Sequence, residues 1–93
     1  MNIHQIIAIV ADETGISTKD IISQSRRQDR VLARHLSMWA CRWYSGASLQ
    51  KIASAHNRIQ HGSVIHAAST IEGIIKFDKR IAELQTKILN RIK

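Results

Sequence analysis

The chain contains no proline and only four glycines among its 93 residues. Proline breaks helices, and glycine is the usual residue of tight turns. A chain with so few of either has few places where a helix must stop, so the sequence predicts an all-α fold with short connections. The length allows one small domain, and no internal repeat is present. We therefore expect residues 1–93 to form a single small helical domain of about six helices that contains a helix-turn-helix.

The spacing of apolar residues and the positions of capping residues predict where the helices lie. Ser48 is the expected N-cap of the fourth helix, and Gly46 is the expected stop of the third. Trp39 and Trp43 lie four residues apart in the third helix, so both are expected in the core. The predicted helices cover about 3–13, a short segment through 21 and 22, 29–44, 49–55, 62–75 and 78–92.

The charge balance indicates an anionic partner. Fourteen Lys and Arg residues against seven Asp and Glu residues give a formal net charge of +7, with a sequence pI near 10.4. So large a basic excess on a short chain favours nucleic acid as the partner. The alternative is a basic surface that is only solvated.

The single cysteine, Cys41, cannot form an internal disulfide, which favours a reducing, cytoplasmic location and a buried thiol. The longest apolar run, residues 6–11, is too short to span a bilayer. Neither a signal peptide nor a membrane helix is therefore expected, and no membrane partner is predicted.

The segment "HNRIQHGSVIHA", residues 56–67, holds three histidines at intervals of five. On a helix, five residues rotate a side chain by about 500°, which leaves it roughly 140° from its starting face. Zinc-binding helices use a spacing of four instead, and no cysteine pair adds ligands. His56, His61 and His66 are therefore not expected to bind a metal, and no cofactor is predicted.

The sequence gives no indication of an enzyme. The seven acidic residues are scattered and do not form an acid–base pair. The glycine-rich phosphate loop of nucleotide hydrolases is absent, so no nucleotide is expected to bind this chain.

A helix-turn-helix accounts better for residues 48–75, because a short capped helix, a polar turn and a longer helix follow one another. This motif places the start of its second helix against base edges in the major groove. The predicted base-reading residues at that start are Gln60, His61, Gly62 and Ser63. The exposed amides of a helix start also favour a phosphate. A plain helical hairpin with a polar turn is the alternative.

Arg26 and Arg27 lie in a polar loop before the third helix. Such a basic loop can lie along a phosphate strand or enter the minor groove. Arg34, in the following helix, is expected to extend the same basic surface.

The chain resembles the C-terminal DNA-binding domain of the bacterial replication initiator DnaA, a relative of the Trp-repressor helix-turn-helix group. The resemblance covers about residues 5–89. It rests on "DIIS" before a basic loop, "ARHLSMWA" for the R-Q-x-A-M-type helix, "SLQKIASAH" for "SLPEIGDAF" and "IQHGSVIHA" for "RDHTTVLHA".

The resemblance implies double-stranded DNA as the partner, and it implies roles for individual residues. Arg26 matches the arginine that enters the minor groove, and residues 60–63 match the quartet that reads the major groove. Gln50 matches the proline that borders the site. With Lys51 and Arg58 added from this sequence, the predicted phosphate-contacting residues are Arg34, Gln50, Lys51, Arg58 and His66.

The chain departs from the family pattern within the quartet. Gln60 replaces an aspartate, Gly62 replaces a threonine, and Ile59 replaces the preceding arginine. Each lost contact changes base discrimination by about 1–3 kcal/mol. We therefore expect altered or relaxed preference relative to the family's TTATNCACA-type box. As a freestanding monomer the chain would be a phage product or a small regulator; as a fragment it would be the DNA-anchoring end of an initiator.

An interaction module that has kept the fold and lost DNA binding is the alternative. In that case Ile81, Leu84 and Ile88, with Leu89 and Ile92 nearby, would form a partner surface on the last helix. The pattern favours packing of this face onto the domain's own core.

Overall fold

The computed structural model describes residues 1–93 and consists of six helices without strands, which confirms the predicted all-α class. Five of the helices begin and end within one residue of their expected positions, and the short second helix ends at Ile21, one residue before the expected Ile22. None of the helices is long and apolar enough to cross a membrane. The helices are α1 (Ile3–Thr14), α2 (Thr18–Ile21), α3 (Gln28–Tyr44), α4 (Leu49–Ala55), α5 (Gly62–Ile74) and α6 (Lys79–Ile92).

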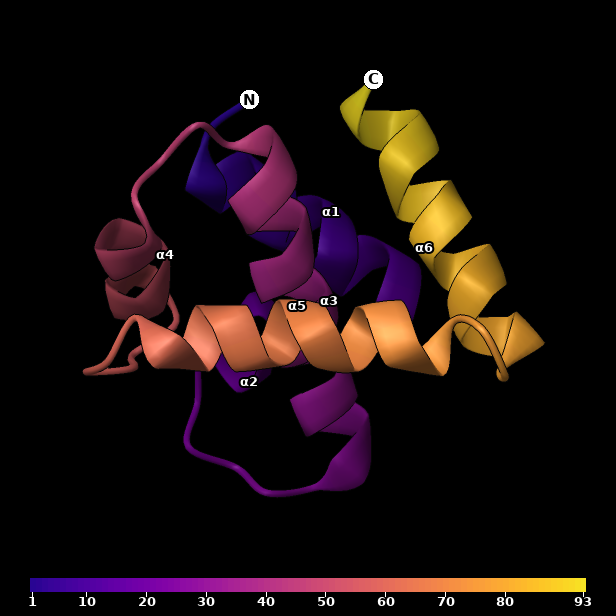
Figure 1. Cartoon of the computed structure of the whole chain (residues 1–93), viewed down its shortest axis with the longest axis horizontal. Coiled ribbons are helices and arrows are strands. Elements are labelled where there is room, and N and C mark those ends of the chain that lie inside the picture. Colours follow the sequence, from indigo (N-terminus) through magenta and orange to yellow (C-terminus); the bar gives the residue numbers. More distant parts are fainter.

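Helix α3 is the centre of the molecule, because it contacts all five other helices. In Figure 1, α5 crosses in front of α3, α4 lies beside the start of α5, and α6 follows its end. The long loop between α2 and α3, residues 22–27, extends below α5 in the same view. Eight residues of α3 are buried, and apolar residues of the other helices complete one core. The fold thereby brings α5 and the 22–27 loop to the same face.

Trp43 corrects one prediction. Trp39 is buried and contacts the ring of Tyr44 edge-on, as expected of a core residue, whereas the Trp43 side chain is 53% exposed. A step of four residues rotates a side chain by about 40°, and here α3 ends one residue later. Trp43 therefore lies at the margin of the buried face, where the Arg42 guanidinium covers its ring at 4.8 Å from the centroid.

The apolar face of α6 packs inward. Ile81 and Ile88 are buried, and Leu84 is half-buried against the same core. The apolar face of α6 that an interaction module would offer to a partner is thus largely packed against the core of this domain. Cys41 is fully buried as expected, and burial raises the pKa of its thiol to about 12.

Side-chain caps fix the starts of several helices. Ser48 accepts a hydrogen bond from the Lys51 amide at 3.2 Å, as predicted for the start of α4. Asp78 caps α6 by accepting from the amides of Arg80 and Ile81 at 3.0 and 3.3 Å. A carboxylate at a helix start also interacts favourably with the helix dipole.

Asp78→Ala is expected to lower the free energy of unfolding by about 1 kcal/mol, because it leaves two amides of α6 without their cap. Urea denaturation followed by circular dichroism measures the loss. Glu83→Ala, which removes an exposed acid of the same helix, is the control and should change stability by less than about 0.5 kcal/mol. Equal stability of Asp78→Ala and Glu83→Ala would contradict the capping role.

Candidate nucleic-acid interface

Helices α4 and α5, with the turn of residues 56–61 between them, form the predicted helix-turn-helix. One side of α5 is buried in the core through Val64, Ala67, Ala68 and Ile71. The opposite side is exposed and begins with Gln60, His61 and Gly62, while Ser63 is half-buried. The four predicted base-reading positions therefore lie together at the leading end of α5, and three of them face solvent.

Some backbone amides at the start of α5 donate hydrogen bonds to carbonyls of the preceding turn. The amides of Ser63 and Val64 donate to the carbonyls of Gln60 and His61 at 3.1 and 3.0 Å. No side chain caps the helix, and the amide of Gly62 has no acceptor within the chain. The amides of Ser63 and Val64 are therefore not free to bind a phosphate, whereas the amide of Gly62 is. The side chains of the leading turn make no capping contact. A Cβ added at Gly62 would meet nothing within 4 Å, so the surface above it is open.

Hydrogen bonds tie the turn to the 22–27 loop. The Gln24 side chain donates to the Asn57 carbonyl at 2.8 Å, and the Asn57 side chain donates to the Ile22 carbonyl at 3.0 Å. The backbone of Asn57 is in the left-handed region, with φ of 57°, where asparagine is favoured. These bonds join segments more than 30 residues apart and fix the basic loop beside the start of α5.

Arg34 corrects a second prediction. Its side chain is only 4% exposed, so it offers little surface to a phosphate. Its Nε donates to the Ile21 carbonyl at 2.7 Å, and its Nη2 donates to the Ser25 carbonyl at 3.1 Å. Arg34 therefore positions the basic loop from below instead of extending the outer surface.

Arg58 adds a second guanidinium to this region. It donates to the carbonyls of His56 and Asn57 in its own turn, and to the Ser23 carbonyl of the loop at 3.2 Å. Burial lowers the pKa of Arg58. Burial, and then the charge of Arg58, lower the pKa of Arg34. None of the five ion pairs in the chain includes either residue.

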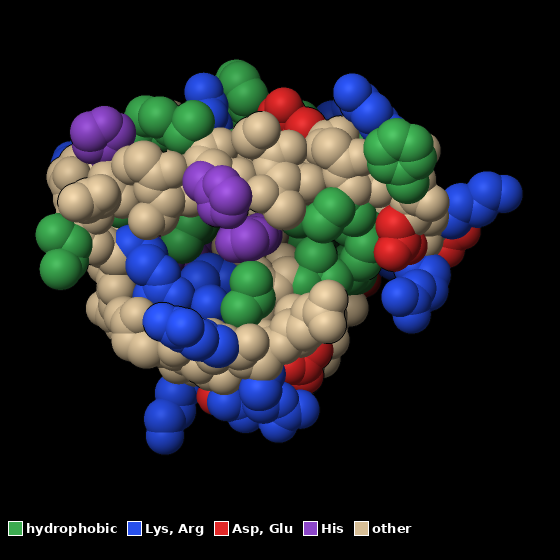
Figure 2. All heavy atoms as spheres, turned by 60° about the horizontal axis from the view of Figure 1, so that its bottom comes forward, with side chains coloured by type: hydrophobic (Ala, Val, Ile, Leu, Met, Phe, Trp, Pro, Cys, Tyr) green, Lys and Arg blue, Asp and Glu red, His purple; other side chains and the backbone are tan.

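The two arginines thus form a positive site that no carboxylate neutralises. Figure 2 shows Lys and Arg side chains gathered in a hollow of this face, with histidines beside them and the acidic side chains elsewhere. Two like charges in a partly desolvated place are stabilised by an added anion. The hollow therefore fits an anionic group that lies between α5 and the loop.

The two loop arginines differ. Arg27 pairs with Asp29 at 3.4 Å, and both side chains are largely exposed. Arg26 is exposed and forms no ion pair. Arg26 is therefore the loop cation that is fully available to a partner, while the Asp29 carboxylate competes for Arg27.

His56 does not face outward, although it lies in a polar segment of the sequence. It is fully buried, with Nδ1 at 2.8 Å from the Ile52 carbonyl and Nε2 at 2.7 Å from the Ser37 hydroxyl. Because a carbonyl only accepts, Nδ1 carries the hydrogen and Nε2 accepts from the hydroxyl. Burial lowers the pKa of His56 to about 4. His56 is a neutral core residue.

The other two histidines of the segment are exposed, and His66 meets the ring of His35 edge-on, with centroids 5.8 Å apart. The three histidines are not brought together. The chain contains no group of three or more His, Cys, Asp or Glu side chains arranged to hold a metal ion.

The remaining predicted contacts lie at the edge of the turn. The Gln50 side chain donates to the Ile59 carbonyl at 3.1 Å and supports the turn, while Lys51 is exposed. Sequence reasoning missed Gln24 and Asn57, which tie the loop to the turn. An asparagine at a helix end, where a left-handed residue is common, was the available signal for Asn57.

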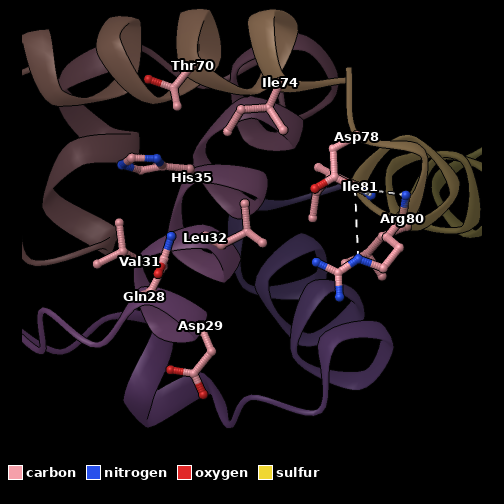
Figure 3. A pocket seen from close by; sticks show the side chains of 11 residues that line it. Gln28, Asp29, Val31, Leu32, His35, Thr70, Ile74, Asp78, Arg80 and Ile81 are labelled. Carbon is pink, nitrogen blue, oxygen red and sulfur yellow. Dashed lines mark hydrogen bonds and ion pairs between the residues drawn. The ribbon is translucent and has the colours of Figure 1, made fainter. Parts of the chain in front are cut away.

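A separate groove of about 740 Å³ lies between α3, α5 and α6. Figure 3 shows Leu32 and Val31 of α3 on one side, with Thr70 and Ile74 of α5 and Ile81 of α6 on the other. None of the predicted DNA-contacting side chains lines this groove.

Comparison with known proteins identifies relatives. A family model described as "Bacterial dnaA protein helix-turn-helix" matches residues 3–71. The chain is 36% identical over 89 residues to the chromosomal replication initiator protein DnaA of Cutibacterium acnes, which covers 96% of this chain and 18% of that protein. It is also 36% identical over 80 residues to the DnaA of Aquifex aeolicus, covering 86% of this chain and 20% of that protein.

A solved structure gives the same result. The crystal structure of a DNA replication initiation factor superimposes with a TM-score of 0.79 at 31% identity, over 98% of this chain and 29% of that one. The chain thus spans about a fifth of the length of the initiators it matches. With the family model matching most of its length, the chain belongs to the bacterial DnaA helix-turn-helix family.

Proposed function

We propose that this chain binds double-stranded DNA with sequence preference. Helix α5 would enter the major groove, with Gln60, His61, Gly62 and Ser63 at the base edges, and Arg26 would enter the adjacent minor groove. The observation that carries the proposal is the Arg58 guanidinium with the buried Arg34 guanidinium near it. Both donate only to backbone carbonyls of the loop, α2 and the turn, and neither forms an ion pair. Membership of the DnaA helix-turn-helix family supports it.

A phosphate strand separates the two grooves, and the proposed docking places one strand across the hollow between α5 and the loop. Arg58, Lys51 and His66 would then contact phosphates, while Arg34 would hold the loop and add its charge from beneath. Gln50 would act by fixing the Ile59 carbonyl. The net charge of +7 suits this partner. We propose that residues 1–93 act as one binding unit.

The proposed base preference differs from that of the family box. Gln60 presents an amide that can bond an adenine through two hydrogen bonds, in place of an acceptor for cytosine. Gly62 has no side chain and makes no side-chain contact to a base. We therefore propose a site related to the origin boxes of the initiators, with changed bases opposite these two positions. Such a protein can act at an origin or as a regulator of transcription.

Fluorescence anisotropy tests the proposal on duplexes with a DnaA-type box and on scrambled duplexes, at several salt concentrations. We expect a dissociation constant that rises steeply with salt, because phosphate contacts release counterions. Arg26→Ala and His61→Ala should each weaken binding by about tenfold without unfolding the domain. Lys87→Ala, which removes an exposed charge on α6, is the control and should change affinity little.

The outcomes separate three cases. Preference for the box supports an initiator-like site, and equal, salt-sensitive binding to both duplexes supports a different site. The absence of binding at low salt, or an unchanged affinity of both variants, would overturn the proposed interface.

A further inference from the structure

Ile59 is the most exposed large apolar residue of the chain, with 91% of its surface open to solvent. Its backbone is nonetheless fixed, because the Gln50 side chain donates to the Ile59 carbonyl at 3.1 Å and lies 3.4 Å from the Ser54 hydroxyl. A fixed backbone and an uncovered side chain mean that this isoleucine points outward from the turn in a defined place.

The surroundings of Ile59 are polar and basic. Its chain neighbours are Arg58 and Gln60, followed by the exposed His61 and Gly62 at the start of α5. A protein partner that recognised an apolar side chain would be expected to find further apolar residues around it. Here the nearest charges are positive and unneutralised, which fits a polyanion that also carries an apolar group.

DNA offers one such group in the major groove, namely the C5 methyl of thymine. We propose that Ile59 packs against a thymine methyl and makes the protein prefer thymine at that position. The inference rests on the proposed docking of α5 in the major groove. From Ile59 to Ser63, Gln60, His61 and Ser63 offer polar side chains and Gly62 has none, so Ile59 is the one apolar side chain of this segment.

The test begins with selection of bound sites from random duplexes by the wild-type chain and by Ile59→Ala. Phe77→Ala is the matched control, because Phe77 is 90% exposed at the other end of α5. We expect the wild type and Phe77→Ala to enrich thymine at one position that Ile59→Ala leaves unselected. Each thymine of the selected site is then replaced singly by deoxyuridine, which lacks only the methyl group. Loss of one buried methyl contact should weaken wild-type binding about three- to fivefold at that position.

Ile59→Ala should bind the thymine and deoxyuridine duplexes equally. The deoxyuridine series uses the wild-type protein, so it is informative even if a variant folds poorly. Failure of the wild type to bind any duplex would refute the proposed function itself. Selection of a site with no response to any deoxyuridine, or the same thymine preference in Ile59→Ala, would refute the role of Ile59 and leave the DNA binding intact.

Discussion

Arg34→Lys is expected to lower the free energy of unfolding by about 2 kcal/mol, although it keeps the positive charge. The Arg34 guanidinium donates from two different nitrogens to the Ile21 and Ser25 carbonyls. A single ammonium cannot reproduce this fork, and it would remain almost completely buried beside Arg58. The substitution therefore removes a charge-assisted bond while keeping the desolvated charge.

Chemical denaturation of three variants tests this explanation. Arg34→Met removes both hydrogen bonds but also removes the buried charge, so we expect a smaller loss, of about 1 kcal/mol. Arg80→Lys is the control, because Arg80 is 89% exposed and its only ion pair, with Asp78, is 3.9 Å long. If Arg34→Lys is as stable as the wild type, the two bonds do not hold the loop. Loosening of the loop should also weaken DNA binding, because Arg26 is no longer positioned.

The helices could be predicted from the sequence because their signals are local. Apolar spacing within one or two turns and caps such as Ser48 depend on residues at most about seven positions apart. The same holds for the leading end of α5, where Gln60, His61 and Gly62 are exposed as the pattern indicated. Their contacts with DNA remain predictions.

The errors arise where the environment is set by distant residues. His56 belongs to a polar stretch in the sequence, yet its ring is buried in the core and is hydrogen-bonded to Ser37, 19 residues away. Arg34 follows a basic loop and is expected at its surface, yet it turns inward to Ile21, 13 residues away. Trp43 continues the apolar stripe of α3, but no other part of the fold covers the end of that stripe, so Trp43 is exposed. Periodicity gives the face of a residue on its helix but not what lies opposite that face.

The domain is expected to lose stability as the pH falls from about 6.5 to about 4, because His56 stays neutral in the fold and takes up a proton when the chain unfolds. Its pKa is lowered from the ordinary 6.5 to about 4 in the folded state, mainly through burial. Between these values the unfolded chain binds more protons than the folded chain, so stability rises with pH. The stabilisation is fully present above about pH 6.5. A difference of this size corresponds to roughly 3 kcal/mol lost by pH 4.

Urea denaturation at pH values from 4 to 7.5 measures this dependence. His35 adds to it in the same direction, since burial and the charge of His66 lower its pKa. His56→Gln should remove most of the slope between pH 4 and 6.5, at the expense of stability at neutral pH, because the bonds to Ser37 and the Ile52 carbonyl are disturbed. His61→Gln changes an exposed side chain and should keep the wild-type slope. A wild-type stability that stays flat across this range would contradict the prediction. It would mean that His56 binds a proton as readily in the folded chain as in the unfolded chain, despite its two buried hydrogen bonds.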